Sequence, residues 1–354
     1  MEALKAEIVA RKDYLHGDAV NTIYFGGGTP SLLSIKEIDE LLHLINNIYP
    51  AAENPEITLE ANPDTLTVEY LEGLRNLGIN RLSIGIQSFF DNDLQYLGRK
   101  HDSRHARQCL DWAKQAGFSN ISIDLIYGLP TSNAEQWNRN LDLFFELGLP
   151  HLSAYALTLE PNAILTKQIE LGKIPAVNEE DALRDYEILC KRAAENGYLH
   201  YEISNFCKSG MHSKHNASYW FGTPYAGFGP SAHSFDGSSR QWNVANVEKY
   251  IGALPMTDRN SGACPTVGKA PIDKELLSPE QNYNEYVMLR LRTHWGIDLK
   301  WLKREMGERF STYCEQHAQP LIAQGRLSQT REFLYLTDKQ MLFADGVAEE
   351  LFLE

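Results

Sequence analysis

The residues of this sequence that are best suited to chemistry begin with a run of three glycines. The segment YFGGGTP, residues 24–30, places the glycines directly after a β-rich stretch. Glycines without side chains let a backbone approach a ligand closely and expose its N–H and C=O groups to it. A phosphate-binding loop would continue with Gly-Lys-Ser/Thr, which is absent here. The run therefore indicates either a close ligand contact or a tight strand–helix turn.

Three polar residues lie inside, or at the C-terminal end of, otherwise apolar stretches: Glu60, Gln87 and Asp124. A buried carboxylate without a partner is unfavourable, so several of them are tolerated where they converge on a ligand or on each other. The C-terminal ends of the strands in a (β/α) barrel face one shared cavity. An open sheet would spread the same groups along a line. These residues therefore favour a barrel.

Short β-rich runs alternate with longer stretches of helical periodicity through the first two hundred residues. Strands are predicted at 21–25, 56–60, 81–87, 120–127, 151–157 and 199–203, and helices near 35–48, 67–77, 103–117, 134–147 and 179–197. This alternation predicts parallel strands joined by right-handed crossovers. It fits a doubly wound sheet as well as a barrel, and the polar residues decide for an α/β fold of the (β/α) barrel type.

The pattern changes after residue 205. Residues 205–240 are rich in Gly, Ser, His and aromatic side chains and are predicted to form a long ordered loop. We expect a barrel domain over 1–240, a proline-containing linker over 241–280 and a small winged-helix-like α+β domain over 281–354. Winged-helix folds often bind DNA, but in an acidic chain such a domain more often packs on its neighbour or binds protein.

The composition narrows the class of protein. The chain has 354 residues, a net charge of −14 and five cysteines. This acidity argues against a nucleic-acid partner, because affinity for nucleic acids depends on Lys and Arg neutralising phosphates. The cysteines are widely spaced, as in reduced cytoplasmic proteins. No signal peptide and no stretch long enough to be a transmembrane segment is found in the sequence, so we expect a cytoplasmic location.

A second cluster of chemically capable residues is HSKHNASYW, residues 212–220. Cys207, His212 and His215 could together bind a metal ion, although a fourth ligand for zinc is not apparent. His233, in GPSAHSF, is either a further candidate or a structural residue.

The strings GGGTPSLL, TLEANPD, RLSIGIQSF, LGR and SIDLIYGLP occur in this order. The chain thereby resembles, over essentially its whole length, the radical S-adenosylmethionine (SAM) family of oxygen-independent coproporphyrinogen III oxidase and its relatives. The resemblance implies a radical SAM barrel lacking its first strand. It also implies that Gly27, Gly28 and Thr29 hold the amino end of SAM. Glu60, Gln87, Arg99 and Asp124 would line the SAM cavity, and Thr158 would make a backbone contact. Arg99 could instead be a surface helix residue and Asp124 a buried strand partner.

HNxxYW, at residues 215–220, resembles the signature of the heme chaperone branch of this family. In that branch the histidine is tied to heme binding, so the resemblance makes His215 the candidate heme ligand. A neutral imidazole is a good axial ligand of heme iron, and aromatic neighbours suit a porphyrin face. Heme or porphyrin, a heme-acceptor protein and a second copy of the chain are the implied partners.

The resemblance also implies a [4Fe–4S] cluster held by a CxxxCxxC segment, which would lie before residue 1. No three cysteines of this sequence fall within ten residues of each other, so this chain alone has no metal site for the cluster. We expect reductive cleavage of SAM to fail without it, and the strand at 21–25 to be an exposed apolar edge. The leading hypothesis is a heme-trafficking chaperone, and the alternative is a SAM-dependent coproporphyrinogen III oxidase; whether the chain is an enzyme stays open. A barrel hydrolase or lyase unrelated to SAM is a third possibility.

Overall fold

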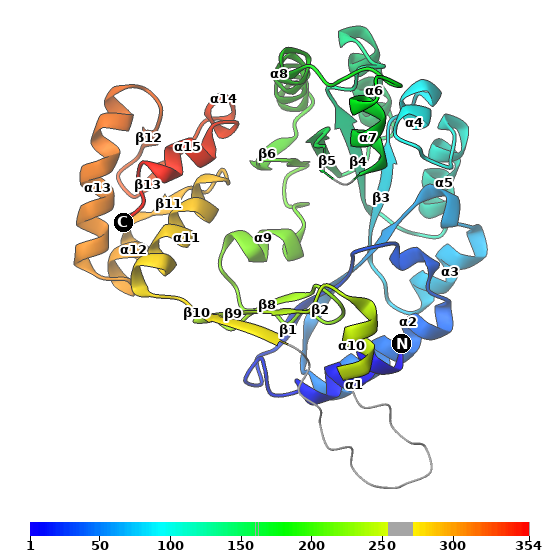
Figure 1. Cartoon of the computed structure of the whole chain (residues 1–354), viewed down its shortest axis with the longest axis horizontal. Coiled ribbons are helices and arrows are strands. Elements are labelled where there is room, and N and C mark those ends of the chain that lie inside the picture. Colours follow the sequence, from blue (N-terminus) through cyan, green and yellow to red (C-terminus); the bar gives the residue numbers. More distant parts are fainter. Residues whose placement is uncertain (160, 162, 254–271, 354) are drawn as a thin grey trace, which may run out of the picture.

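The computed structural model describes residues 1–159, 161, 163–253 and 272–353 (Figure 1). Its centre is a seven-stranded sheet with the order β1-β2-β3-β4-β5-β7-β6. The strands are β1 (Val20–Phe25), β2 (Ala51–Ala61), β3 (Arg81–Gln87), β4 (Asn120–Tyr127), β5 (His151–Ala156), β6 (Leu199–Glu202) and β7 (Asn205–Cys207). The first five pair in parallel, and β7 is antiparallel to both of its neighbours. The curled sheet is the predicted partial barrel, with β1 at one open edge.

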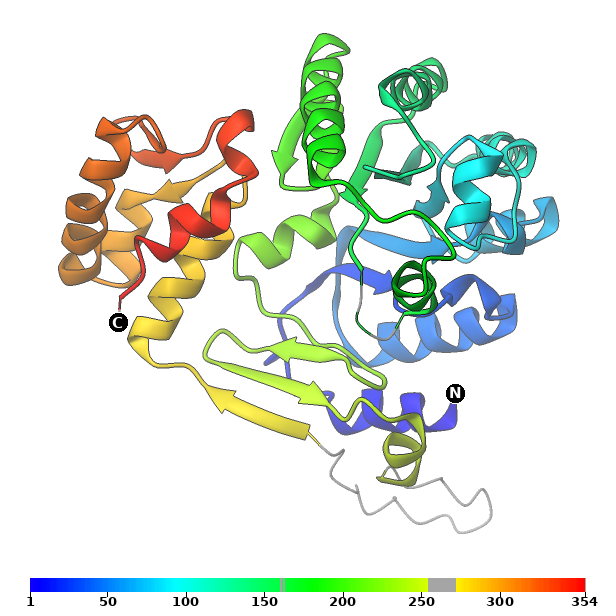
Figure 2. The ribbon, with the colours of Figure 1, turned by 45° about the horizontal axis from the view of Figure 1, so that its top comes forward.

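Helices cover the outer face of this sheet (Figure 2). The helices packed on the sheet are α2 (Ile35–Ile48), α3 (Val68–Asn76), α5 (Ser103–Gln115), α6 (Ala134–Glu146) and α8 (Glu179–Glu195), and α1 (Glu2–Ala10) packs on α2. The connections also contain α4 (Asp91–Tyr96), α7 (Ile164–Glu170) and the short 3-10 turns η1 (Pro30–Leu32) and η2 (Pro63–Thr65). Outward residues of the strands, such as Leu59, Ile84 and Ile123, form one buried core with α2, α3, α5, α6 and α8. Removing this apolar surface from water is the main stabilising contribution.

The inner face of the sheet is polar because the side chains of a strand alternate between its two faces. Thr58, Arg81 and Asn120 pair across β2, β3 and β4 and so share one face. Two residues further along, Glu60 pairs with Ser83 in the same way. The sequence thus places apolar residues against the helices and polar residues toward the hollow of the half-barrel.

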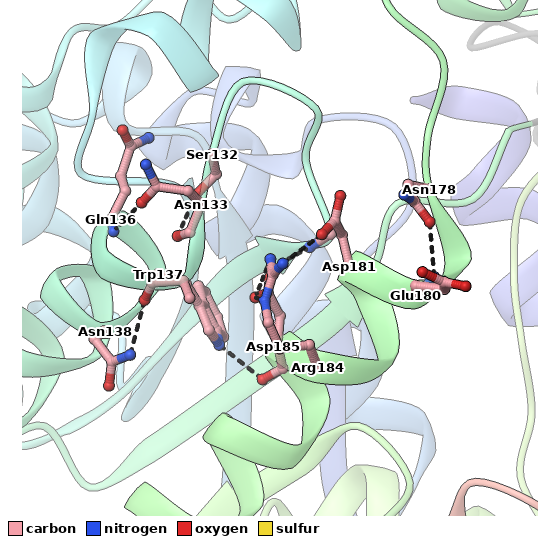
Figure 3. Close-up of polar contacts among 12 residues, drawn as sticks. Ser132, Asn133, Gln136, Trp137, Asn138, Asn178, Glu180, Asp181, Arg184 and Asp185 are labelled. Atoms are coloured by element: carbon pink, nitrogen blue, oxygen red, sulfur yellow. Dashed lines mark hydrogen bonds and ion pairs between the residues drawn. The ribbon is translucent and has the colours of Figure 1, made fainter.

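The junction after β4 is fixed by contacts between α6 and α8 (Figure 3). The Trp137 indole N–H donates to the backbone oxygen of Asp185 at 2.8 Å. The Asp185 carboxylate in turn accepts from the backbone N–H of Gly128 at 3.2 Å. Asn133 and Asn178 cap the two helices through their side-chain oxygens. Gly128, in the IYGLP string, is therefore held directly against α8.

The segment predicted as a loop at 205–240 contains regular structure, so that prediction was wrong. It holds β7, α9 (Lys214–Trp220), β8 (His233–Phe235) and the start of β9 (Ser239–Asn243). β10 (Ile272–Leu276), β9 and β8 form an antiparallel three-stranded sheet, and α10 (Val247–Ala253) follows β9. These elements are too short to show a clear period in the sequence. Of the expected linker at 241–280, residues 254–271 lie outside the described residues.

The small C-terminal domain is present, with its own buried core. It comprises α11 (Pro279–Leu291), β11 (Ile297–Asp298), α12 (Leu299–Glu305), α13 (Glu308–Ala323), β12 (Ser328–Gln329), β13 (Phe333–Tyr335), α14 (Asp338–Met341) and α15 (Ala344–Glu349). Two backbone hydrogen bonds join it to β6, from Ile203 to Arg292 at 3.2 Å and from His294 to Tyr201 at 3.1 Å. Among the described residues, no helix has the length and apolar character needed to cross a membrane.

Candidate functional site

The glycine run follows β1 and is tied to the end of β2 by Glu60. The Tyr24 hydroxyl donates to one carboxylate oxygen of Glu60 at 2.6 Å, and the Gly27 backbone N–H donates to the other at 3.0 Å. A Cβ atom at position 26 would lie 2.5 Å from the Tyr24 ring and 3.2 Å from Glu60. Glycine is thus required there by close packing. Glu60 fixes the loop at the mouth of the half-barrel.

Gln87 and Arg99 meet beside Gly85. Gln87 has a φ of +67°, and the pairing of β3 with β4 shifts register just before it. Such strained backbone in a non-glycine residue concentrates at functional sites. Arg99 donates to the Asn62 side chain at 3.3 Å and to the Gly85 carbonyl at 3.2 Å. Arg99 is therefore a half-buried residue of the inner face, and the alternative of a surface helix residue is excluded.

Asp124 lies on the same inner face and pairs with Ser153 of β5. Burial, together with the negative charge of Glu60, raises the pKa of Asp124 to about 7, although Ser153 and two arginines act in the opposite direction. Arg99 is one of these arginines, and burial lowers its own pKa. The charges of Glu60 and Arg99 therefore act on Asp124 across the inner face of the sheet. That these side chains line one SAM cavity stays a prediction.

Thr29 follows the glycine run after β1, and Thr158 follows β5. The Thr29 hydroxyl accepts from the Asn62 amide at 3.5 Å, and Asn62 also contacts Arg99. Thr158 is exposed after β5 and donates to the Ala156 carbonyl at 3.4 Å. Their binding roles, like those of the other predicted cavity residues, remain predictions.

Arg81 is a site residue that the sequence reasoning missed. It is 1% exposed, and its Nε atom has no hydrogen-bond partner among the described residues. Its positive charge lowers the pKa of both Asp124 and His215. Arg81 pairs with Asn120, which stands four residues before Asp124 on β4, and even spacing along β4 places Asn120 and Asp124 on one face. The alternation of inward and outward side chains along a strand is the sequence signal that could have identified Arg81 as a residue of the inner face.

His215 lies at the start of α9, which a carboxylate in the middle of β2 holds in place. Glu56 accepts the backbone N–H groups of Lys214 at 3.1 Å and His215 at 3.0 Å, so a carboxylate stabilises the N-terminal end of the helix. The His215 ring stacks on Tyr24 with centroids 4.5 Å apart. Nδ1 hydrogen-bonds the Thr22 hydroxyl at 2.7 Å, and Nε2 hydrogen-bonds the Tyr219 hydroxyl at 2.9 Å.

The environment of His215 favours the neutral ring. Burial, with a further contribution from Arg81, lowers the pKa of His215 to about 4. A neutral imidazole carries one N–H and one free lone pair. If the N–H at Nδ1 donates to Thr22, the lone pair at Nε2 faces Tyr219, which is 37% exposed. In the described structure this lone pair is thus hydrogen-bonded to the hydroxyl of a partly exposed side chain.

His215 opens into a groove of about 1180 Å³ beside the free edge of β1. Apolar side chains of α1 and α2 form one wall, and the segment from α9 to β8, which includes Phe228, forms the other. The expected open apolar edge of β1 is therefore this groove. His212 and His233 also line it. His233 is exposed and stacks on Trp242 with centroids 6.0 Å apart.

The alternative of a metal site at Cys207, His212 and His215 is wrong. Cys207 is 1% exposed within β7, and His212 packs edge-on against Tyr201 and Trp295. Within the described ranges, no group of three or more His, Cys, Asp or Glu side chains could hold a metal ion.

Comparison with known proteins identifies the family. The sequence model of the Radical SAM superfamily matches residues 2–144, and that of the HemN C-terminal domain matches residues 277–343. The heme chaperone HemW of Escherichia coli (strain K12) is 38% identical over 345 residues, covering 96% of this chain and 86% of that protein. HemW of Bacillus subtilis (strain 168) is 31% identical over 348 residues, covering 98% and 89%. The chain belongs to the HemW family.

The HemW relationship agrees with the three-dimensional fold. The structure of coproporphyrinogen III oxidase (HemN) from Escherichia coli, a radical SAM enzyme, superposes with a TM-score of 0.82 at 22% identity, covering 99% of this chain and 82% of that one. At this identity the likeness shows the shared fold alone. The predicted family, the radical SAM scaffold and the small C-terminal domain are thereby confirmed.

Proposed function

We propose that this chain is a heme chaperone that binds heme through Nε2 of His215. The observation that carries the proposal is the neutral His215 ring, anchored at Nδ1 by Thr22 and opening at Nε2 into the large groove. Histidine ligands of metals commonly have the second ring nitrogen fixed by a hydrogen bond, which sets the tautomer and raises the basicity of the ligand. The names of the HemW relatives point to the same cargo.

The shape and lining of the groove also support heme as the cargo. Its volume of about 1180 Å³ exceeds the range of about 300–1,000 Å³ that is typical of pockets for small ligands. Its walls combine apolar helix side chains with Tyr24, Tyr219 and Tyr225. Aromatic and aliphatic walls suit the faces of a porphyrin. Transfer to an acceptor protein in the cytoplasm, and pairing with a second copy, belong to the same proposal.

The polar inner face is proposed to bind SAM. The Arg99 guanidinium suits a carboxylate, and Asp124 suits hydroxyl groups or an ammonium. Both carboxylate oxygens of Glu60 already accept hydrogen bonds, so we assign Glu60 the task of holding Gly27 and its neighbours in a ligand-ready shape. SAM would supply a reactive sulfonium there.

The [4Fe–4S] cluster of the family does not fit the described residues. Cys109, Cys190, Cys207 and Cys314 are free, and no described group of three could hold a metal ion. We therefore derive no step through a cluster. The oxidase alternative rests on the fold that is shared with HemN, which does not favour it over the chaperone.

Titration with hemin, followed by the Soret absorbance, tests the chaperone proposal. We expect wild type to bind and His215→Ala to bind at least about tenfold more weakly, a loss of about 1.4 kcal/mol or more. His43→Ala, an exposed histidine on α2, is the matched control and should bind like wild type. His233→Ala tests the second candidate and should stay within about twofold of wild type. Equal binding by His215→Ala and wild type would refute the assignment.

A further inference from the structure

A second cavity lies between the half-barrel and the C-terminal domain, on the other side of α9. Its volume is about 520 Å³, and it is lined by the end of β5, the β6–β7 turn, α9 and residues around α15. Asn216 and Trp220 of α9 face this cavity, whereas His215 faces the groove beside β1. In Figure 1 the C-terminal domain stands opposite β6 and α9. The cavity is therefore distinct from the proposed heme groove.

Two buried hydrogen-bond acceptors in the wall of this cavity have no partner. Glu202 is 3% exposed and Asn205 is 5% exposed. Oε1 of Glu202 and Oδ1 of Asn205 accept no hydrogen bond from the described residues. Leaving a buried acceptor unpaired costs about 1–3 kcal/mol, and more for a charged group. Both residues line the cavity, and a ligand that brings N–H or O–H donors into it would supply the missing partners.

Three aromatic side chains also line the cavity, and its arginine is already paired with a carboxylate. Arg292 donates two hydrogen bonds of 2.7 Å to the Asp345 carboxylate. Tyr155 is 43% exposed and Tyr219 is 37% exposed. Trp220 completes the aromatic side. Aromatic faces attract cations, and most strongly where water is partly excluded.

We propose that this pocket binds a guanidinium group. Its planar fork of N–H donors matches two neighbouring oxygen acceptors, and its flat faces stack on aromatic rings. An ammonium is a compact, strongly hydrated charge and gains less from such stacking. The ligand class is a small guanidino compound or an arginine side chain of another protein. The inference does not depend on His215, although Tyr219 lines both this cavity and the groove beside β1.

The charge of Glu202 makes this binding sensitive to pH. Burial raises the pKa of Glu202 to about 7, while hydrogen bonds from Asn205 and the charges of His200 and Arg292 act in the opposite direction. Burial alone would lower the pKa of His200, but Asp338 and Cys190 raise it to about 9, so His200 keeps its charge below that value. The carboxyl of Glu202 is about 90% ionised at pH 8 and about 10% at pH 6. Guanidinium affinity should therefore rise about tenfold between these two values.

Two probes of matched shape test the proposal: N-acetyl-argininamide carries a guanidinium, and N-acetyl-citrullinamide carries a neutral urea in its place. Isothermal titration of the full chain at about pH 8 should detect the arginine compound, with at least fivefold weaker binding of the citrulline compound. Glu202→Gln should weaken the arginine compound at least fivefold and abolish the pH dependence. Tyr155→Leu should weaken binding of the arginine compound severalfold. Because Tyr155 is partly exposed, this variant should fold even if Glu202→Gln does not.

A third probe separates the two sources of the guanidinium. If the blocked peptide Gly-Arg-Gly binds within about threefold of N-acetyl-argininamide, the pocket is open enough for the arginine of a protein partner. If the peptide binds more than tenfold more weakly, the ligand is a free guanidino compound. Either result supports the pocket. Absence of binding by every probe, equal binding of the arginine and citrulline compounds, or unchanged binding by a folded Glu202→Gln variant would overturn it.

Discussion

At the scale of single residues, two side chains prepare His215 for a ligand. Thr22 anchors Nδ1, and the Tyr24 ring supports one face of the imidazole. Burial keeps the ring uncharged. The chemistry of HNxxYW could be inferred from residue types, but Thr22 lies 193 positions away from His215 in the sequence. No local sequence pattern indicates such a contact, because it forms only when β1 and α9 pack together in the folded chain.

The pKa of His215 gives a direct prediction at this scale. A ring with a pKa of about 4 stays neutral at pH 5.5, whereas an ordinary histidine with a pKa of about 6.5 is about 90% protonated there. In an NMR titration of the histidine ring signals, we expect that of His215 to remain unshifted between about pH 8 and about pH 5.5. A His215 midpoint near 6.5 would contradict the buried environment.

At the scale of elements, the junction between β4 and α8 explains the most specific string of the sequence. Gly128 has a φ of +71°, and a Cβ atom there would lie 2.8 Å from the Cβ of Ala182. Glycine in IYGLP is thus required both by its backbone angle and by the close approach of α8. The sequence shows this string, but the position of α8 had to be known to explain why glycine is required in it.

Gly128→Ala should therefore destabilise the protein by about 2–5 kcal/mol, from left-handed backbone strain of about 1–2 kcal/mol and overpacking of about 1–3 kcal/mol. Gly148→Ala is the control, because Gly148 has a φ of +64° and open space around its missing Cβ. It should lose about 1–2 kcal/mol from strain alone. Urea unfolding measures both. Equal losses in the two variants would show that α8 does not press on Gly128.

Most of the barrel strands could be predicted because five of them carry long apolar runs with a period that the core dictates. β7 has three residues, and it enters the sheet between β5 and β6. α9 has seven residues and depends on Glu56 of β2 for its start. Because β7 and α9 are stabilised by residues elsewhere in the chain, their local sequence predicts a loop.

At the scale of the whole molecule, the C-terminal domain is joined to β6 by backbone hydrogen bonds and shares the second cavity with α9. The Tyr186 hydroxyl of α8 also donates to the Asp338 carbonyl of α14 at 3.2 Å. The sequence indicated this domain from its helices and hairpin. Its docking on β6 could not be predicted, because it depends on the turn around Thr293.

This docking predicts that the two domains unfold together. Differential scanning calorimetry should show one transition, with calorimetric and van't Hoff enthalpies that agree. Tyr186→Phe removes one hydrogen bond across the interface and should lower the transition temperature slightly without splitting it. Two resolved transitions in wild type would mean that the domains are energetically independent.

The central claim, that heme occupies the groove beside β1 and is ligated by His215, is tested most directly by a crystal structure of the hemin complex. We expect the porphyrin between β1 and the segment from α9 to β8, with iron bonded to Nε2 of His215. The Tyr219 hydroxyl should have moved away from that nitrogen, while Thr22 keeps its hydrogen bond to Nδ1. Iron bonded to another side chain, or a porphyrin lodged elsewhere on the molecule, would contradict the claim.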